Sequence, residues 1–102
     1  MRTVFVANRA EIAHRVIRTA RRLGFRTVAV ASEADRELPY ARAADRCVVL
    51  EGSSEVRATY LDAARMVEAA VRSGADAVHP GYGFLSENAA FAEAVEAAGL
   101  TW

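Results

Sequence analysis

Residue types that would indicate a charged binding partner are scarce in this chain of 102 residues. All 13 basic residues are arginine, lysine is absent, and 13 acidic residues bring the formal net charge to zero. A protein that binds nucleic acid or an anionic membrane surface needs a basic excess, so we expect neither partner. Cysteine is limited to Cys47, which excludes an internal disulfide and favours a cytoplasmic location.

Long hydrophobic runs are also missing. The apolar stretch near the N-terminus ends at Ala7 and is too short for a signal peptide, and no stretch is long enough to span a bilayer. The composition, 53% apolar and 25% charged, is that of an ordinary globular domain. The length predicts a single small domain over residues 1–102.

Short apolar runs alternate with segments of helical spacing. The runs predict strands over residues 4–7, 27–31, 47–50 and 76–78, with a fifth strand barely begun at 101–102. The segments between them predict helices that end at Gly24, Gly74 and Gly99. This alternation implies right-handed crossovers and hence an α/β fold, a Rossmann-like parallel sheet of four to five strands with helices on both faces.

Each predicted helix has an expected start and an inward face. Asn8 and Glu11 form a capping-box pattern for the first helix. The second helix is predicted from Tyr60 to Ser73, and Ser86 is placed to cap the third. The residues expected to face inward are, helix by helix, Ile12, Val16, Ile17, Ala20 and Leu23; Leu61, Ala64, Val67 and Val71; and Phe91, Val95 and Ala98.

Ligands of such folds bind at the loops that follow the carboxyl ends of the strands. The first of these turns, residues 7–11, lacks the glycines that allow a backbone to approach a pyrophosphate. Glu33 follows the second strand, where dinucleotide-binding proteins carry an acid for the ribose, but without the glycines this agreement is weak. A nucleotide-binding oxidoreductase domain is therefore the disfavoured interpretation.

The most informative stretch is HPGYGFLSEN, residues 79–88, which follows the fourth predicted strand. Gly81 and Gly83 permit positive φ and leave room for another backbone or a flat ligand. Tyr82 between them offers an aromatic face and a hydroxyl. From composition alone, the stretch is also consistent with a tight loop that needs glycines only for its own geometry.

The same stretch resembles the signature of biotin carboxylases, the ATP-dependent subunits or domains of acetyl-CoA, propionyl-CoA, methylcrotonyl-CoA and pyruvate carboxylases. An ordered match over nearly the whole chain is far more specific than an isolated glycine pattern. The further matching segments are residues 6–13, Arg15, 18–20, 27–30, 32–36, 44–45, 60–61 and 74–78. One departure is Ala10, which stands where the family usually has glycine.

The resemblance implies a role within a larger enzyme. Biotin carboxylases use ATP and Mg²⁺ to activate bicarbonate as carboxyphosphate, and they then carboxylate biotin carried on a partner protein. The implied place of this chain is the truncated N-terminal, pre-ATP-grasp domain, with the ATP-grasp and C-terminal domains absent. The implied partners are those two domains, the biotin carboxyl carrier protein and the carboxyltransferase. By this reading the chain alone is inactive and binds neither ATP nor biotin tightly.

The resemblance also assigns roles to the loop residues. Tyr82 and Gly83 are expected beside the bound biotin, with the Gly83 backbone against the flat ureido ring. We expect no catalytic residue and no metal ligand in this chain. The residues expected to support the loop through hydrogen bonds are His79, Gly81, Glu87 and Asn88.

Arg15, Arg18 and Arg22 form one stripe on the first predicted helix, opposite its apolar face. Such a stripe is consistent with a solvated surface or with an interface, because arginine is favoured in partner contacts. The family resemblance implies a homodimer interface in this region. A non-catalytic module that dimerises or docks through this helix is therefore the alternative function.

Overall fold

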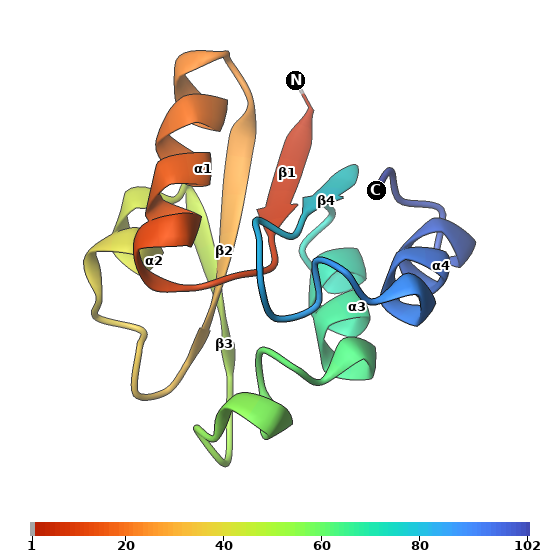
Figure 1. Ribbon diagram of the computed structural model, residues 1–102. Coiled ribbons are helices and arrows are strands. Elements are labelled where there is room, and N and C mark those ends of the chain that lie inside the picture. Colours follow the sequence, from red (N-terminus) through yellow and green to blue (C-terminus); the bar gives the residue numbers. More distant parts are fainter. Residues whose placement is uncertain (1) are drawn as a thin grey trace.

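Four parallel strands form one sheet in the computed structural model, which describes residues 2–102 (Figure 1). The strands are β1 (Thr3–Val6), β2 (Arg26–Ser32), β3 (Arg46–Leu50) and β4 (Ala77–His79), in the spatial order β3-β2-β1-β4. Phe5 of the central β1 pairs with Val28 on one side and Val78 on the other. The predicted parallel α/β sheet is confirmed. The predicted fifth strand is reduced to a single parallel bridge between Ala77 and Thr101.

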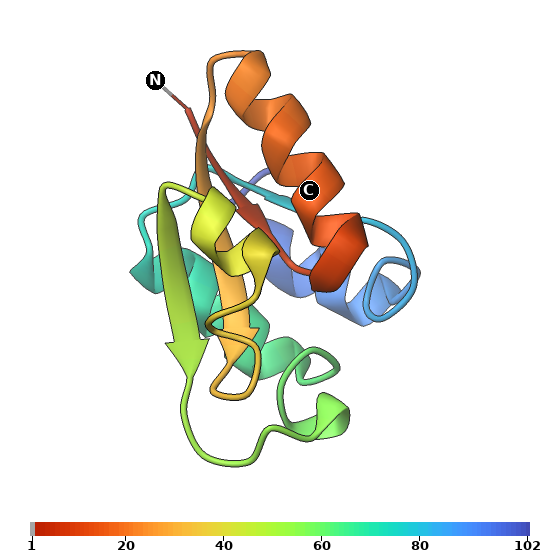
Figure 2. The same cartoon turned by 90° about the vertical axis from the view of Figure 1, so that its left-hand side faces the viewer.

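Helices cover both faces of this sheet, as predicted. Figure 2 looks from the side of α1 (Ala10–Arg22) and α2 (Pro39–Ala43), with α3 (Ala63–Arg72) and α4 (Ala89–Ala97) behind the strands. The chain moves outward from β1 to β3 and then crosses back to place β4 beside β1. Right-handed crossovers taken in opposite directions put their helices on opposite faces. The short α2 and a 3-10 helix at Val56–Ala58 were not predicted from the sequence.

Two separate apolar clusters hold the layers together. Phe5 and Val28 pack with Phe91 of α4 on one face of the sheet. The next residues along the strands, Val6 and Ala29, pack with Ile17 of α1 on the other face. Because successive side chains of a strand point to opposite faces, burial on both sides requires a continuous apolar run. This explains why the strands were recognisable from the sequence.

The helix starts differ from those predicted. Arg9, and not Asn8, precedes α1, and its side chain makes no capping hydrogen bond, so the capping-box prediction is wrong. Helix α3 begins after Asp62, whose carboxylate accepts from the Arg65 amide at 3.1 Å. Helix α4 is capped by Asn88, whose Oδ1 accepts from the Phe91 amide at 2.9 Å, so Ser86 is not its cap. The caps of α3 and α4 are thus local hydrogen bonds between residues three apart, made by Asp62 and Asn88.

Some expected inward positions are exposed. On α3 the buried residues are Met66, Ala69 and Ala70, whereas Leu61, Ala64 and Val71 are exposed. The later start of α3 leaves Leu61 in the preceding turn, and the helix packs through its small alanines, which allow a close approach to the sheet. Leu23 and Ala98 are also exposed, because each lies at the C-terminal end of its helix, past the last buried turn.

The first residue of α1 has an unusual backbone conformation. Ala10 has a φ of 54°, in the left-handed region that a Cβ atom disfavours. The turn that joins β1 to α1 imposes this angle. It explains why glycine is usual at this position in the family that the sequence resembles, because glycine accepts positive φ without strain.

Replacing Ala10 by glycine is therefore expected to stabilise the protein. The relief of left-handed strain outweighs the added freedom of the unfolded chain, for a net gain of about 0.5 kcal/mol in the free energy of unfolding. Urea unfolding of the wild type and of Ala10→Gly measures this gain. Ala64→Gly, at an exposed site within α3, is the matched control and is expected to lose about 0.5–1 kcal/mol. Equal losses in both variants would contradict the strain at Ala10.

Candidate functional site

The direction of strand order reverses between β1 and β4, which lie side by side at the centre and edge of the sheet. In open α/β sheets the crevice at this reversal is where ligands bind. Two loops leave the carboxyl ends of these strands together, residues 7–9 after β1 and residues 80–88 after β4. The Ala7 amide donates to the His79 carbonyl at 2.9 Å, so the loops begin in contact.

Asn8 joins the two loops. Its side-chain Nδ2 donates to the carbonyls of Pro80 and Tyr82, at 2.8 Å each, and its Oδ1 accepts from the Arg9 amide at 2.8 Å. The residue is fully buried. The capping-box pattern predicts a helix cap at Asn8 and gives no indication of this role. A signal was present, since a polar residue at the end of a buried strand needs hydrogen-bond partners.

The predicted biotin-side residues lie at the tip of the second loop. Tyr82 is 71% exposed, and a Cβ added at Gly83 would meet no described atom within 4 Å beyond its chain neighbours. The aromatic ring and the open glycine backbone are therefore both accessible to a ligand. The loop is anchored on either side by the buried Val78 and Leu85, so its tip is exposed while its ends belong to the core.

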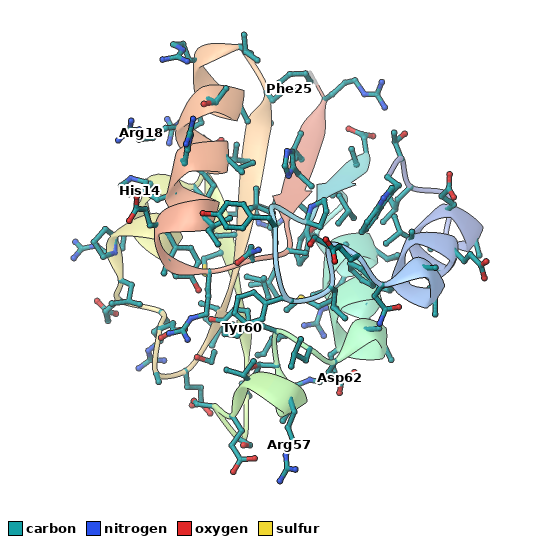
Figure 3. The ribbon with its side chains drawn as sticks, in the orientation of Figure 1. His14, Arg18, Phe25, Arg57, Tyr60 and Asp62 are labelled. Carbon is teal, nitrogen blue, oxygen red and sulfur yellow. The ribbon has the colours of Figure 1, made fainter. Side chains whose placement is uncertain are left out.

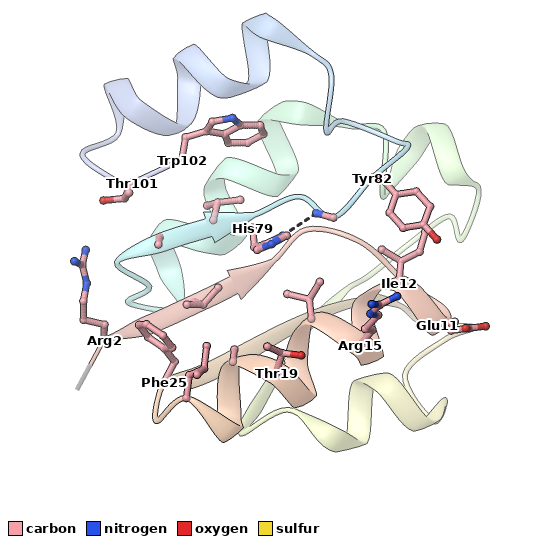
Figure 4. Close-up of a pocket in the computed structure, with 17 residues that line it drawn as sticks. Arg2, Glu11, Ile12, Arg15, Thr19, Phe25, His79, Tyr82, Thr101 and Trp102 are labelled. Carbon is pink, nitrogen blue, oxygen red and sulfur yellow. Dashed lines mark hydrogen bonds between the residues drawn. The ribbon is translucent and has the colours of Figure 1, made fainter.

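The four predicted support residues are in different situations. His79 Nδ1 accepts from the Gly81 amide at 3.0 Å, as the dashed line in Figure 4 shows. Gly81 itself presses against the first loop: a Cβ there would stand 2.7 Å from Ile12 Cγ2 and 2.9 Å from Asn8 Nδ2. Asn88 caps α4, and Glu87 is exposed. The side-chain hydrogen bonds to the loop tip thus come from His79 and Asn8.

A groove of about 870 Å³ runs between α1 and β4, with Tyr82 at one end and Phe25 at the other (Figure 4). Its floor is the face of β1 and β4 that α1 leaves uncovered, and its rim carries charged side chains. The side chains labelled along it are Arg2, Glu11, Ile12, Arg15, Thr19, Phe25, His79, Tyr82, Thr101 and Trp102. The loop tip therefore borders a long, mostly apolar depression.

A buried polar network lies under the first turn. The guanidinium group of Arg9 contacts the Asp35 carboxylate at 2.9 and 3.0 Å, and Tyr60 donates to the same carboxylate at 2.7 Å. The Tyr60 and Tyr40 hydroxyls are 2.8 Å apart, and burial raises the pKa of both above the ordinary value. Tyr60 lies inside the molecule in Figure 3. The network ties the turn after β1 to the loop after β2.

The arginine stripe is on the outside. Arg15, Arg18 and Arg22 are all exposed on α1, and Arg18 projects away from the sheet in Figure 3. Only Arg15 also borders the groove. The stripe therefore meets the groove at Arg15, whereas Arg18 and Arg22 lie outside the groove lining.

Comparison with known proteins decides the family. The family described as "Biotin carboxylase, N-terminal domain" matches residues 1–102. The chain belongs to this family. This biotin carboxylase N-terminal domain is 60% identical over 99 residues to the alpha subunit of mitochondrial methylcrotonoyl-CoA carboxylase from Oryza sativa, with 97% of the chain and 13% of the relative covered. It is 50% identical to the biotin carboxylase of Haemophilus influenzae, with 97% and 22% covered.

Solved structures agree with the sequence relatives. The biotin carboxylase domain of 2-oxoglutarate carboxylase from Hydrogenobacter thermophilus, solved as a dimer with MgADP and bicarbonate, superposes with a TM-score of 0.90. It is 43% identical, and the match covers 97% of this chain and 21% of that one. The chain therefore spans about a fifth or less of the length of these relatives.

The residues of this domain do not themselves suit Mg²⁺ or ATP phosphates. Within residues 2–102, no three His, Cys, Asp or Glu side chains gather where they could hold a metal ion. The turn after β1 has arginine and alanine where a phosphate cradle has glycines. Neither the metal nor the nucleotide is therefore assigned to residues of this domain. Over the same residues, no helix is long and apolar enough to cross a membrane.

The two glycines of the loop are expected to respond differently to substitution. Both have positive φ, so Gly81→Ala and Gly83→Ala each introduce backbone strain. Only at Gly81 does the new methyl group meet Asn8 and Ile12, which adds about 1–3 kcal/mol of overpacking. Urea unfolding should therefore show a larger loss for Gly81→Ala than for its matched control Gly83→Ala. Equal losses would indicate that the loop is not pressed against Asn8.

Proposed function

We propose that this domain supplies the biotin-facing wall of a biotin carboxylase, an enzyme that uses ATP and bicarbonate to carboxylate biotin held on a carrier protein. The observation that carries the proposal is the exposed Tyr82 beside the open Gly83 backbone, on a loop fixed at the strand-order reversal. Membership of the family and the fold shared with a domain solved with MgADP and bicarbonate support it.

In this proposal the domain binds and orients, and it transfers no proton. The ureido ring of biotin is flat, and Gly83 has no side chain to keep such a ring from the backbone. Tyr82 offers an aromatic face next to it, which favours contact with a planar group. ATP, Mg²⁺ and bicarbonate are assigned to the ATP-grasp and C-terminal domains that accompany this one in the family. When bound to those domains, ATP and Mg²⁺ would supply the activation of bicarbonate, whose carboxyl group is transferred to a biotin nitrogen.

The proposed partners follow from the same role. They are the ATP-grasp and C-terminal domains, the biotin carboxyl carrier protein and a carboxyltransferase. Relatives that carry such a domain include a complete multifunctional pyruvate carboxylase from Rhizobium etli. The cytoplasmic location expected from the single cysteine stays a prediction, because the Oryza sativa relative is mitochondrial.

Removal of the Tyr82 ring tests the biotin-facing wall in the complete carboxylase that contains this domain. Tyr82→Ala is expected to raise the KM for biotin about tenfold, the effect of losing roughly 1.4 kcal/mol of contact, and to leave the KM for ATP within about twofold. Steady-state kinetics with free biotin measures both constants. Tyr82→Phe keeps the ring and is the matched control.

An unchanged KM for biotin in Tyr82→Ala would remove the loop from the biotin site. Calorimetry on the 102-residue chain alone gives an independent check. Because the proposal assigns ATP to other domains, titration of ATP with Mg²⁺ into this chain should produce no binding heat. Tight binding there would contradict that assignment.

A second role, as a dimerisation surface, is favoured by one observation. Arg15, Arg18 and Arg22 are exposed together on α1 and none of them makes an ion pair within residues 2–102. Arginine is enriched at protein interfaces because its planar group makes several directed hydrogen bonds. A second copy of the domain that presents acceptor groups to this stripe would use them.

Reversal of one charge in the stripe tests this role. If α1 forms an interface, Arg18→Glu should weaken the dimer at least about tenfold, since truncating or reversing a buried charge contact costs roughly 2–5 kcal/mol. Sedimentation equilibrium of the complete protein measures the dissociation constant. Arg72→Glu, on α3 and away from the stripe, is the matched control. Monomers for both wild type and Arg18→Glu would exclude the interface.

A further inference from the structure

Within residues 2–102, only the Asn8 side chain hydrogen-bonds to both neighbours of Gly81 in the loop that carries Tyr82. The carbonyls that its amide group contacts belong to Pro80 and Tyr82, the residues immediately before and after Gly81. The orientation of the amide is fixed by these contacts, because the opposite orientation would place its oxygen against two other oxygens. Both donor hydrogens are therefore committed to the loop.

Gly81 also packs closely against Asn8. Gly81 has a φ of 66°, and its α-carbon lies so near Asn8 and Ile12 that a methyl group would not fit. Because Asn8 is fully buried, solvent is excluded from the donor side of both hydrogen bonds. A carbonyl left without a partner here would cost roughly 1–3 kcal/mol, so other loop conformations are disfavoured. The direction in which Tyr82 leaves the loop is set by this contact.

The turn that contains Asn8 is held in place by further contacts of Arg9. The next residue, Arg9, donates its amide to Asn8 Oδ1, and its side chain is bound to the buried Asp35. Asp35 also accepts from Tyr60, whose ring the Arg9 guanidinium group overlies at 5.3 Å. Loops after β1, β2 and β4 are thereby connected through two consecutive residues. A side chain mounted in this way is suited to positioning a neighbouring group.

We propose that Asn8 is a positioning residue for biotin, which acts through the Pro80 and Tyr82 carbonyls to hold Tyr82 and Gly83 in their ligand-facing conformation. The inference rests on the proposed function, in which these two residues border biotin. Asn8 itself does not touch the substrate. Its loss should therefore impair biotin binding without affecting the part of the reaction that uses ATP.

The test replaces Asn8 by aspartate, which has the same shape but offers no hydrogen-bond donor when ionised. In the complete carboxylase, Asn8→Asp should raise the KM for biotin about tenfold and leave the KM for ATP within about twofold. In the same variant, hydrogen exchange at the Gly81 amide should become at least about tenfold faster, because the loop loses two anchors. Asn88→Asp, which needs only an acceptor to cap α4, is the control for the exchange measurement.

The outcomes separate the inference from the proposed function. Unchanged exchange at Gly81 in Asn8→Asp would overturn the inference, and so would faster exchange with an unchanged KM for biotin while Tyr82→Ala raises it. If Tyr82→Ala also leaves that KM unchanged, the proposed biotin-facing wall fails, and the positioning role fails with it. Should Asn8→Asp not fold, Asn8→Ser, which keeps one donor, is measured in the same way and is expected to show a smaller rise in KM.

Discussion

The site depends on a buried amide group between two adjacent strand ends. In the order β3-β2-β1-β4, the loops after β1 and β4 start side by side. Asn8, in the first loop, donates to two carbonyls of the second loop at once, and it does so from a fully buried position. Unmade hydrogen bonds in such a place are costly, so this single contact links sheet topology to loop conformation.

Around this contact, the residues that hold the loop are mostly buried, whereas Tyr82 at the loop tip is exposed. The side chains of Asp35, Tyr60 and Tyr40 are buried, and through Asp35 they hold the partly exposed side chain of Arg9 in the turn that also carries Asn8. Tyr82, whose carbonyl accepts a hydrogen bond from the Asn8 side chain, is mostly exposed. A binding wall needs this combination, because a ring held by a rigid backbone loses little freedom when a ligand arrives. In the proposed function, the domain therefore orients the substrate, and the reacting groups belong to other domains.

The regular elements and the loop motif could be predicted, whereas helix starts and faces could not. Runs such as Val4–Ala7 are apolar because both faces of the sheet are covered, and that signal is local. Asn8 also has a local signal, a capping pattern with Glu11, but its actual partners lie 72 and 74 residues away. The two hydrogen bonds from the buried Asn8 amide group stabilise the fold more than one exposed helix cap would. On α3, likewise, the buried face is set by close packing of Ala69 and Ala70, which composition does not mark as core.

The sequence by itself determined the alternation of strands and helices, the family, and the loop with Tyr82 between two glycines. Each of these follows from short segments of consecutive residues and from their order along the chain. Only the tertiary structure decided that β4 lies beside β1 and that Asn8 reaches across to the second loop. These features depend on contacts between segments distant in the chain. Such contacts exist only once the sheet order is fixed, and no short stretch of residues encodes that order.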